Sequence, residues 1–188
     1  MNIVFLRHGV TEWNKENRLQ GQSDIPLAPE GILGAKRAGK LLKNYRFDAV
    51  YCSSLRRARQ TAQLAYPQVD AIPDDRLMEW RFGEIEGLLP SEYGTRFRDC
   101  WQFGVEPVPG GETIEELIGR VGTFVEEIKK KHPDGTVLVV AHGGVSVALQ
   151  LYLKGEADVG NVMSLCLPNT TPALFRNLDY HPIPLEEV

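Results

Sequence analysis

The chain has 188 residues, of which 43% are hydrophobic and 24% charged, and its formal net charge at pH 7 is −4. This balance is ordinary for a soluble globular protein and argues against a protein that coats nucleic acid or an anionic membrane. The sequence has no apolar run of membrane-spanning length, no signal-peptide pattern and no C-x-x-C pair among its three cysteines. We therefore expect a single cytoplasmic domain over residues 1–188, without a zinc site.

The chain opens with an apolar run that stops on a cation and an imidazole. Residues 3–6 predict a buried strand, and Arg7, His8 and Gly9 follow it directly. Glycine lets the backbone turn sharply, and ligands of open α/β sheets bind at the carboxyl ends of the strands. By themselves, Arg7 and His8 are equally well explained as a functional site or as a solvated strand end.

The next segments alternate between loop, helix and strand. Residues 9–28 show no sustained period and predict a loop, and Pro29 begins a predicted helix that extends to about residue 43. Residues 48–52 predict a second strand. A short edge strand is expected near residues 71–72.

The helix after the second strand begins with cations. Ser54 is its expected N-cap, and Arg56, Arg57 and Arg59 fall in its first turns, where they oppose the helix dipole. A helix start that binds an anion would explain this arrangement. Successive helical side chains diverge by about 100°. We therefore expect Arg57 to face a site, and Arg56 and Arg59 to face water.

Two segments in the middle of the chain suggest a functional loop followed by a cap. Residues 77–87 are irregular and contain Glu79, Glu84 and Glu86. Residues 90–104 predict a helix that carries aromatic side chains, namely Tyr93, Phe97, Trp101 and Phe103.

The remaining elements complete a β-α-β-α order. A capping box of Thr113 and Glu116 opens a helix that ends near residue 132, and residues 136–141 predict a central strand. A buried helix over 145–154 follows. Two late strands, over 164–167 and 173–176, and a surface tail are expected after it. This order predicts a three-layer α/β/α sandwich with a mostly parallel sheet.

The central strand ends on His142-Gly143-Gly144, which repeats the pattern of the opening strand. If the two strands are parallel neighbours, His8 and His142 meet at one sheet edge with Arg7 and Arg57. Two guanidinium groups and a helix N-terminus favour a phosphoryl group over a carboxylate as the ligand.

A histidine beside a bound phosphoryl group can attack phosphorus and form a phosphohistidine. That attack requires a general acid to protonate the departing alkoxide. Glu79 is the candidate, and Glu84 and Glu86 are rivals on spacing alone.

The motifs, in this order and over most of the chain, resemble those of the histidine phosphatase superfamily, the phosphoglycerate mutase-like proteins. The resemblance rests on Leu6-Arg7-His8-Gly9 with Thr11, Trp13 and Asn14; Gln20-Gly21 with Asp24 and Pro26-Leu27; Ser53-Ser54-Leu55 with Arg57-Ala58 and Thr61-Ala62; Glu79 with Phe82-Gly83 and Glu86-Gly87; Gly110-Gly111-Glu112-Thr113; and Val140-Ala141-His142-Gly143-Gly144.

This resemblance implies a phosphoglycerate mutase-like fold and a catalytic His8 that becomes phosphorylated. It further implies a phosphate pocket of Arg7, Arg57 and His142, and a Glu79 that acts first as acid and then as base, without a metal ion or another cofactor. It places the substrate beside Asn14, Thr11, Gln20, Gly21 and Gly143.

Residues 87–111 bear on the choice between phosphatase and mutase. The mutases resemble this chain but are typically longer, with an extra basic segment, whereas here the only basic residues of the stretch are Arg96 and Arg98. We expect this segment to form a small apolar cap. We therefore expect hydrolysis of a small phosphorylated metabolite, as in α-ribazole phosphatase and related small-molecule phosphatases, with mutase activity as the alternative.

Departures from the family pattern at Val10, Ala28 and Ile85 leave the natural substrate open, and the sequence is equally compatible with a monomer and a homodimer. Two remote alternatives remain. One is a serine hydrolase that uses Ser146 with Asp179 and His181 in α/β-hydrolase order. The other is a phosphate-binding module without catalysis.

Overall fold

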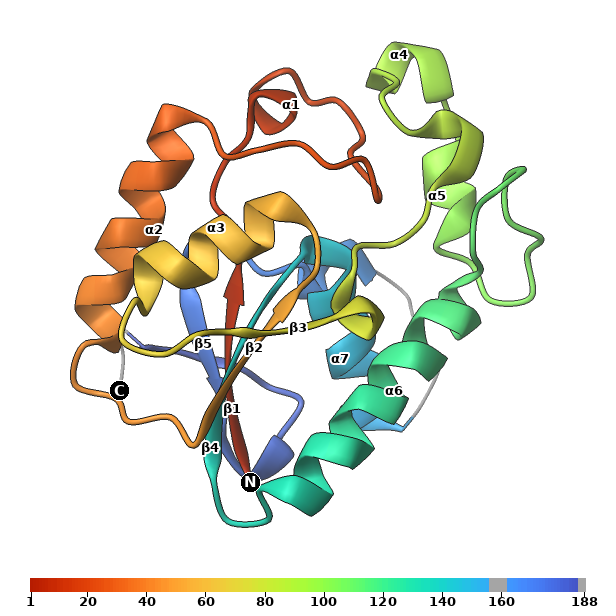
Figure 1. Ribbon diagram of the computed structural model, residues 1–188. Helices are drawn as coiled ribbons and strands as arrows, with labels where there is room; N and C mark the ends of the chain where they lie inside the picture. The colour runs from red at the N-terminus through yellow and green to blue at the C-terminus, as the bar shows by residue number, and fades with distance from the viewer. Residues whose placement is uncertain (156–161, 186–188) are drawn as a thin grey trace.

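The computed structural model describes residues 1–155 and 162–185 (Figure 1). Its strands are β1 (Asn2–Arg7), β2 (Ala49–Ser53), β3 (Ile72–Asp74), β4 (Thr136–Ala141), β5 (Pro172–Phe175) and β6 (Ile183–Pro184). The longer helices are α2 (Pro29–Leu42), α3 (Arg56–Ala65), α6 (Ile114–Lys131) and α7 (Gly143–Lys154). Short helices are α1 (Glu12–Lys15), α4 (Pro90–Tyr93) and α5 (Arg96–Cys100), with 3₁₀ turns η1 (Asp75–Leu77), η2 (Gly83–Ile85), η3 (Val162–Leu165) and η4 (Arg176–Leu178).

The strands form one sheet in the order β3-β2-β4-β1-β5-β6. β4 lies between β1 and β2 and is parallel to both, and β3 is parallel to β2. β5 is antiparallel to its neighbour β1, and β6 is antiparallel to β5. The predicted central strand and mostly parallel sheet are therefore confirmed. Arg7 pairs with Ala141 in the register of β1 and β4, so His8 and His142 leave the sheet at the same level.

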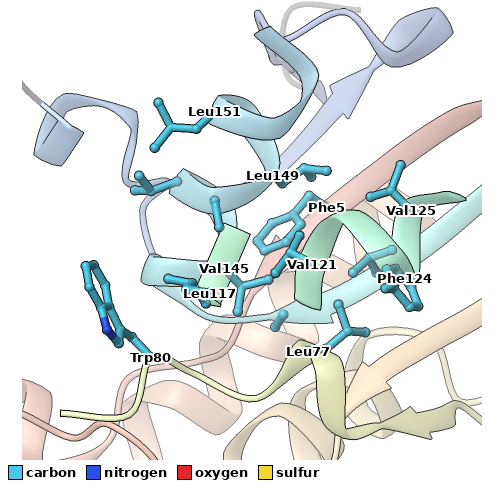
Figure 2. Packing of buried hydrophobic residues seen from close by; sticks show 14 of the residues in the cluster. Phe5, Leu77, Trp80, Leu117, Val121, Phe124, Val125, Val145, Leu149 and Leu151 are labelled. Atoms are coloured by element: carbon cyan, nitrogen blue, oxygen red, sulfur yellow. The ribbon is translucent and has the colours of Figure 1, made fainter. Parts of the chain in front are cut away.

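Helices cover both faces of the sheet, as the predicted sandwich requires (Figure 1). Successive residues of a strand point to opposite faces, so β1 contributes to two cores. Ile3 and Phe5 pack with α6 and α7, whereas Val4 and Leu6 pack with α2 and α3. Figure 2 shows Phe5 among side chains of the first core, including Leu117, Val121, Val145 and Leu149.

The start of α3 differs from the predicted one. The N-cap is Leu55, not Ser54, and it offers no side-chain hydrogen bond. Asp24 replaces the missing cap from the preceding loop, since its Oδ1 accepts from the Arg56 backbone N–H at 2.6 Å. The Ser54 hydroxyl instead bonds to the Asp75 carboxylate. The helix is therefore capped by a residue that is distant in sequence.

Two segments contain different helices from those expected. The predicted loop over 9–28 includes α1, which is capped by Thr11: its Oγ1 accepts from the Asn14 backbone N–H at 3.2 Å. The single helix expected over 90–104 is wrong, because Gly94 interrupts it at φ 57° between α4 and α5. A right-handed helix requires negative φ values.

The strand expected over 164–167 is also wrong. Its backbone groups bond to side chains instead of to a neighbouring strand. Gln150 donates to the Leu165 carbonyl at 2.6 Å, and the Leu167 N–H donates to Ser146 Oγ at 3.1 Å. Arg7 donates to the Leu167 carbonyl at 3.1 Å. The segment is therefore hydrogen-bonded to α7 and to the end of β1.

The C-terminal residues hold further differences. The strand expected over 173–176 corresponds to β5, and part of the predicted surface tail forms β6, which pairs with β5. The helix expected from 145 begins at Gly143. The loop predicted between Gly155 and residue 160 lies largely outside the described residues. Within the described ranges, no helix is long and apolar enough to cross a membrane.

Candidate active site

A pocket of about 340 Å³ lies at the carboxyl ends of β1 and β4, and side chains of α4 and α5 form part of its lining. It contains all of the predicted site residues except Thr11 and His142. A larger hollow of about 600 Å³ beside α3 contains none of them, so we assign the candidate site by chemistry and not by size. The smaller pocket is lined by Arg7, His8, Asn14, Asn17, Arg18, Leu19, Gln20, Gly21, Arg57, Glu79, Phe82, Pro90, Tyr93, Phe97, Trp101, Gly143, Gly144 and Cys166.

His8 is held by the backbone directly after β1. Its amide donates to the Ala141 carbonyl at 2.9 Å, and Asn169 donates to its carbonyl at 2.7 Å. Its Nδ1 lies 2.7 Å from the Gly9 carbonyl oxygen. A carbonyl only accepts, so Nδ1 carries the proton and, in the neutral ring, Nε2 keeps the lone pair.

Electrostatics favour the neutral form of His8. Burial, together with the positive charges of Arg57 and Arg7, holds the pKa of His8 well below its usual range. The imidazole is therefore a free base at neutral pH, as a nucleophile must be.

His142 lies beside His8, with 5.1 Å between the ring centroids. It is fully buried, and its Nε2 is 2.8 Å from Ser53 Oγ at the end of β2. Burial, followed by the charge of Arg57, holds the pKa of His142 well below its usual range. An anion bound between the rings would oppose this effect, because negative charge favours the protonated imidazole.

Arg57 is fully buried, as expected for the one arginine of α3 that faces the site, whereas Arg56 and Arg59 are exposed. Its guanidinium donates to the carbonyls of Ser23 and Gly21, each at 2.7 Å. Burial lowers the pKa of Arg57 to about 10, so the group remains charged at neutral pH.

Arg7 donates to Leu167 O at 3.1 Å and to Cys166 Sγ at 3.3 Å. Its side chain therefore extends to the segment that follows η3. Both arginines are fixed before any ligand is bound, which reduces the entropy lost on binding.

Glu79 reaches the pocket from the irregular segment after η1. Its Oε1 accepts from the Trp80 N–H at 2.9 Å, and its Oε2 accepts from the Gly144 N–H at 3.2 Å, at the start of α7. A Cβ on residue 144 would lie 2.5 Å from Glu79 Oε1, so only glycine allows this approach.

The two rival glutamates are engaged elsewhere. Glu86 accepts hydrogen bonds from the backbone of Gln22, Ser23 and Phe82, and half-exposed Glu84 pairs with Arg96 at 3.2 Å. Neither lines the pocket. The geometry therefore favours Glu79 among the three.

Thr11 supports the pocket from behind. It is fully buried, and its hydroxyl donates to Gln20 Oε1 at 2.9 Å. Asn14 closes the capping box by accepting from the Thr11 amide at 3.0 Å. Gln20 and Asn14 line the pocket, so Thr11 positions residues of the wall without being part of it.

Sequence reasoning missed Arg120, which holds the backbone around Glu79. Its guanidinium donates to the carbonyls of Met78 at 2.6 Å and Glu79 at 3.0 Å, and it forms two bonds to the Glu112 carboxylate. Cys166 was also missed. No sequence pattern marks Cys166 as a pocket residue. Its place in the pocket is seen only from its contacts, because its sulfur lies between Arg7 and Gly143 at the start of α7.

Four buried side-chain nitrogens have no hydrogen-bond partner in the described part of the chain: Arg7 Nε, Arg57 Nε, Trp101 Nε1 and His142 Nδ1. Buried polar groups of this kind are uncommon and costly, so each needs an explanation. All four belong to residues that line the pocket or directly adjoin it. The three that belong to Arg7, Arg57 and His142 lie with His8 at the end of the pocket that also has two helix N-termini, and they suit an anionic ligand.

The same region does not resemble a metal site or a serine hydrolase. The described residues contain no group of three or more His, Cys, Asp or Glu side chains that could hold a metal ion. Ser146 is fully buried within α7, and its hydroxyl donates to the Gly143 carbonyl at 2.7 Å. Asp179 and His181 are exposed and bond to each other through the His181 amide.

Comparison with known proteins agrees with this geometry. The family model of the histidine phosphatase superfamily (branch 1) matches residues 3–177. The uncharacterized phosphatase PhoE of Bacillus subtilis is 31% identical over 172 residues, which cover 89% of this chain and 86% of PhoE. A 2,3-bisphosphoglycerate-dependent phosphoglycerate mutase of Cytophaga hutchinsonii is 36% identical over 173 residues, covering 85% of this chain and 81% of the mutase.

A solved structure is similar over nearly the whole fold. It is a mutant phosphoserine phosphatase of Entamoeba histolytica in complex with phosphoserine, with a TM-score of 0.83 and 26% identity over 97% of this chain and 94% of that one. The family match spans the strand ends, the arginine of α3 and both histidines. The chain therefore belongs to the histidine phosphatase superfamily.

Proposed function

We propose that the protein is a phosphomonoesterase that acts on a small phosphorylated metabolite through a phosphohistidine on His8. The observation that carries this proposal is a buried, neutral His8 with its Nε2 lone pair free, close to two arginines and a second histidine. Relatives that are phosphatases support the same reaction class. The nearer resemblance to α-ribazole phosphatase remains a prediction.

In the proposed first step, the phosphoryl group binds to Arg7, Arg57 and His142. The His8 Nε2 lone pair attacks phosphorus, and the bond between phosphorus and the ester oxygen breaks. The protonated Glu79 carboxyl gives its proton to the departing oxygen, which leaves as the neutral alcohol.

In the second step, the Glu79 carboxylate takes a proton from water, and the resulting hydroxide attacks the phosphohistidine. The nitrogen–phosphorus bond breaks, inorganic phosphate leaves and His8 regains its lone pair. Neither step uses a metal ion.

Phosphoglycerate mutase activity is the alternative, because a relative of similar identity is a mutase. A mutase must hold the phosphorylated intermediate while the acceptor turns around. Residues 87–111, which we propose act as the cap, contribute aromatic side chains and no arginine to the pocket. We therefore favour transfer to water.

The decisive experiment compares His8→Ala with His181→Ala in the hydrolysis of p-nitrophenyl phosphate in the presence of EDTA. His8→Ala should lower kcat/KM by at least about a thousandfold and abolish the phosphorylated protein detected by mass spectrometry after a rapid quench. His181→Ala, which changes an exposed histidine, should leave both unchanged.

Full activity of His8→Ala would overturn the nucleophile assignment, and loss of activity in His181→Ala alone would revive the serine-hydrolase reading. Binding of inorganic phosphate without turnover of any ester would instead indicate a non-catalytic module. A coupled assay with 3-phosphoglycerate measures mutase activity in the same preparation.

A further inference from the structure

We propose that the alcohol portion of the substrate is uncharged and has an apolar or aromatic body, in contrast to the carboxylated alcohols of phosphoserine and phosphoglycerate. This inference rests on the proposed phosphatase function and concerns the part of the pocket beyond the phosphoryl group. It follows from two features of that part: its aromatic wall and its lack of an available cation.

The aromatic wall consists of side chains from three segments that touch one another. Phe97 is central, with ring centroids 5.4 Å from Phe82, 5.6 Å from Tyr93 and 5.9 Å from Trp101. All four residues line the pocket, together with Pro90. The contacts of Phe97 with Phe82 and Trp101 are edge to face, and the contact with Tyr93 is tilted, so the four rings form a continuous apolar surface.

The charges of the pocket are unevenly divided. Arg7 and Arg57 belong to the end that would hold the phosphoryl group. Among the described residues that line the rest of the pocket, Arg18 is the one cation, and Glu79 is the one carboxylate. A second anionic group on the substrate would therefore have to use Arg18.

Arg18 already has partners. Its Nε pairs with the Glu16 carboxylate at 3.0 Å, Nη1 donates to the Gly87 carbonyl, and its guanidinium carbon lies 5.9 Å from the centre of the Trp13 ring. Glu16 opposes the charge of Arg18, so a substrate carboxylate would have to compete with Glu16 for the guanidinium group. An apolar body meets no such competition and is desolvated against the aromatic wall.

The two arginines of the cap itself do not supply the missing cation. Arg96 pairs with Glu84 at 3.2 Å and also donates to the Glu92 carbonyl, and the side chain of Arg98 is 75% exposed. Neither lines the pocket. The pocket lining also includes Asn14, Asn17 and Gln20, which are polar but uncharged. Uncharged polar side chains suit an ester oxygen or a hydroxyl group better than a carboxylate.

The test uses pairs of esters that differ in charge but have similar leaving groups. Phenyl phosphate is compared with 4-carboxyphenyl phosphate, and 3-phenylpropyl phosphate with 3-(4-carboxyphenyl)propyl phosphate. We expect kcat/KM to be about tenfold or more higher for the uncharged member of each pair. Equal or better turnover of the carboxylated esters would overturn the inference and leave the proposed phosphatase function intact. Failure to hydrolyse any ester would overturn both.

Variants of residues 87–111 test whether the aromatic wall binds the alcohol portion of the substrate. Phe97→Ala should raise KM for phenyl phosphate about tenfold, while inhibition by inorganic phosphate stays unchanged, because phosphate occupies the other end. Phe97→Leu keeps an apolar contact and should restore most of the loss. Phe103→Ala is the matched control, since Phe103 packs against the core and does not line the pocket. An unchanged KM in Phe97→Ala would overturn the assignment of the wall.

Discussion

The two ends of the pocket are built in different ways. At the inner end, His8 and His142 follow neighbouring strands, and Arg57 is held by two backbone carbonyls at 2.7 Å. At the outer end, Phe97 and Tyr93 lie on helices of five and four residues, separated by Gly94 at φ 57°. The inner end is formed by the ends of sheet strands and by α3, whereas the outer end is formed by two short helices outside the sheet.

This difference suits the two ends to different tasks in the proposed reaction. A phosphoryl transfer site requires donors that are fixed before the reaction, because electrostatic stabilisation depends on preorganisation. Strand ends and packed helices provide this rigidity. Short helices and loops tolerate changes in sequence and length, so they are suited to determine which alcohol is accepted. Substitutions at the inner end should therefore affect all esters, and substitutions at the outer end should affect only some.

After His8→Ala, the largest effect is expected for Glu79→Gln. The amide cannot protonate a leaving oxygen, so kcat for alkyl phosphates should fall by about 10² to 10⁴. Nitrophenolate needs little protonation, so p-nitrophenyl phosphate should lose much less. Steady-state kinetics with both esters provides the measurement. An equal loss for the two would remove Glu79 from the acid role, and Glu84→Gln provides a control because Glu84 lies outside the pocket.

Arg57→Lys should lower kcat/KM about a hundredfold for every ester. Lysine keeps the charge but cannot reproduce the planar fork that reaches the carbonyls of Gly21 and Ser23. The ratio between charged and uncharged esters should stay constant, because Arg57 belongs to the inner end. Arg59→Lys, at an exposed position of the same helix, should have no effect. A change in the ester ratio in Arg57→Lys would break the proposed division between the two ends.

The buried histidines should make the unliganded protein less stable in mild acid. Their pKa values in the folded protein lie below the ordinary value of 6.5, so below about pH 6.5 the unfolded chain binds more protons than the folded one. The free energy of unfolding should fall between pH 6.5 and 5.5, by up to about 1.4 kcal/mol per pH unit for each histidine.

Urea unfolding at several pH values measures this slope. His142→Gln should flatten the slope, and His181→Gln, at an exposed position, should not. Added inorganic phosphate should also weaken the dependence, because the anion favours protonated histidine in the folded state. An equally steep slope in His142→Gln would contradict the linkage to this residue.

The smallest effect concerns the outer end. Glu16→Gln removes the partner of Arg18 and leaves its charge unopposed, so KM for 4-carboxyphenyl phosphate should fall about two- to threefold, in line with the weakness of exposed ion pairs. KM for phenyl phosphate should not change. Glu12→Gln is the control, because Glu12 is similarly exposed but pairs with Lys15. An equal shift for both esters would argue against a specific role of Arg18.

The features that the sequence predicted well are those with local causes. Apolar runs predicted β1 and β4, and the capping box of Thr113 and Glu116 predicted the start of α6, where Glu116 N donates to Thr113 Oγ1 at 3.2 Å. The pairing of His8 with His142 followed from two strands that end on the same motif. Helix geometry predicted that only one of Arg56 and Arg57 faces the site, and the structure buries Arg57.

Two of the predictions that failed depended on distant partners. The cap of α3 comes from Asp24, which lies 32 positions before Arg56, and no local pattern indicates it. The strand expected over 164–167 does not form, because backbone groups of this segment make hydrogen bonds with the side chains of Gln150, Ser146 and Arg7. Both outcomes are decided by hydrogen bonds that form only after the chain has folded.

The sequence by itself determined the candidate site residues, the fold class and the family, because residue types, hydrophobic periods and motif order are local properties of the chain. The tertiary structure decided which glutamate reaches the pocket, how His8 is oriented and where the aromatic side chains of residues 87–111 lie. It also paired Arg18 with Glu16, so a carboxylate opposes the one positive charge among the described residues that line the outer end. These properties depend on burial and on contacts between segments that are far apart in the sequence, and both arise only when the chain is packed.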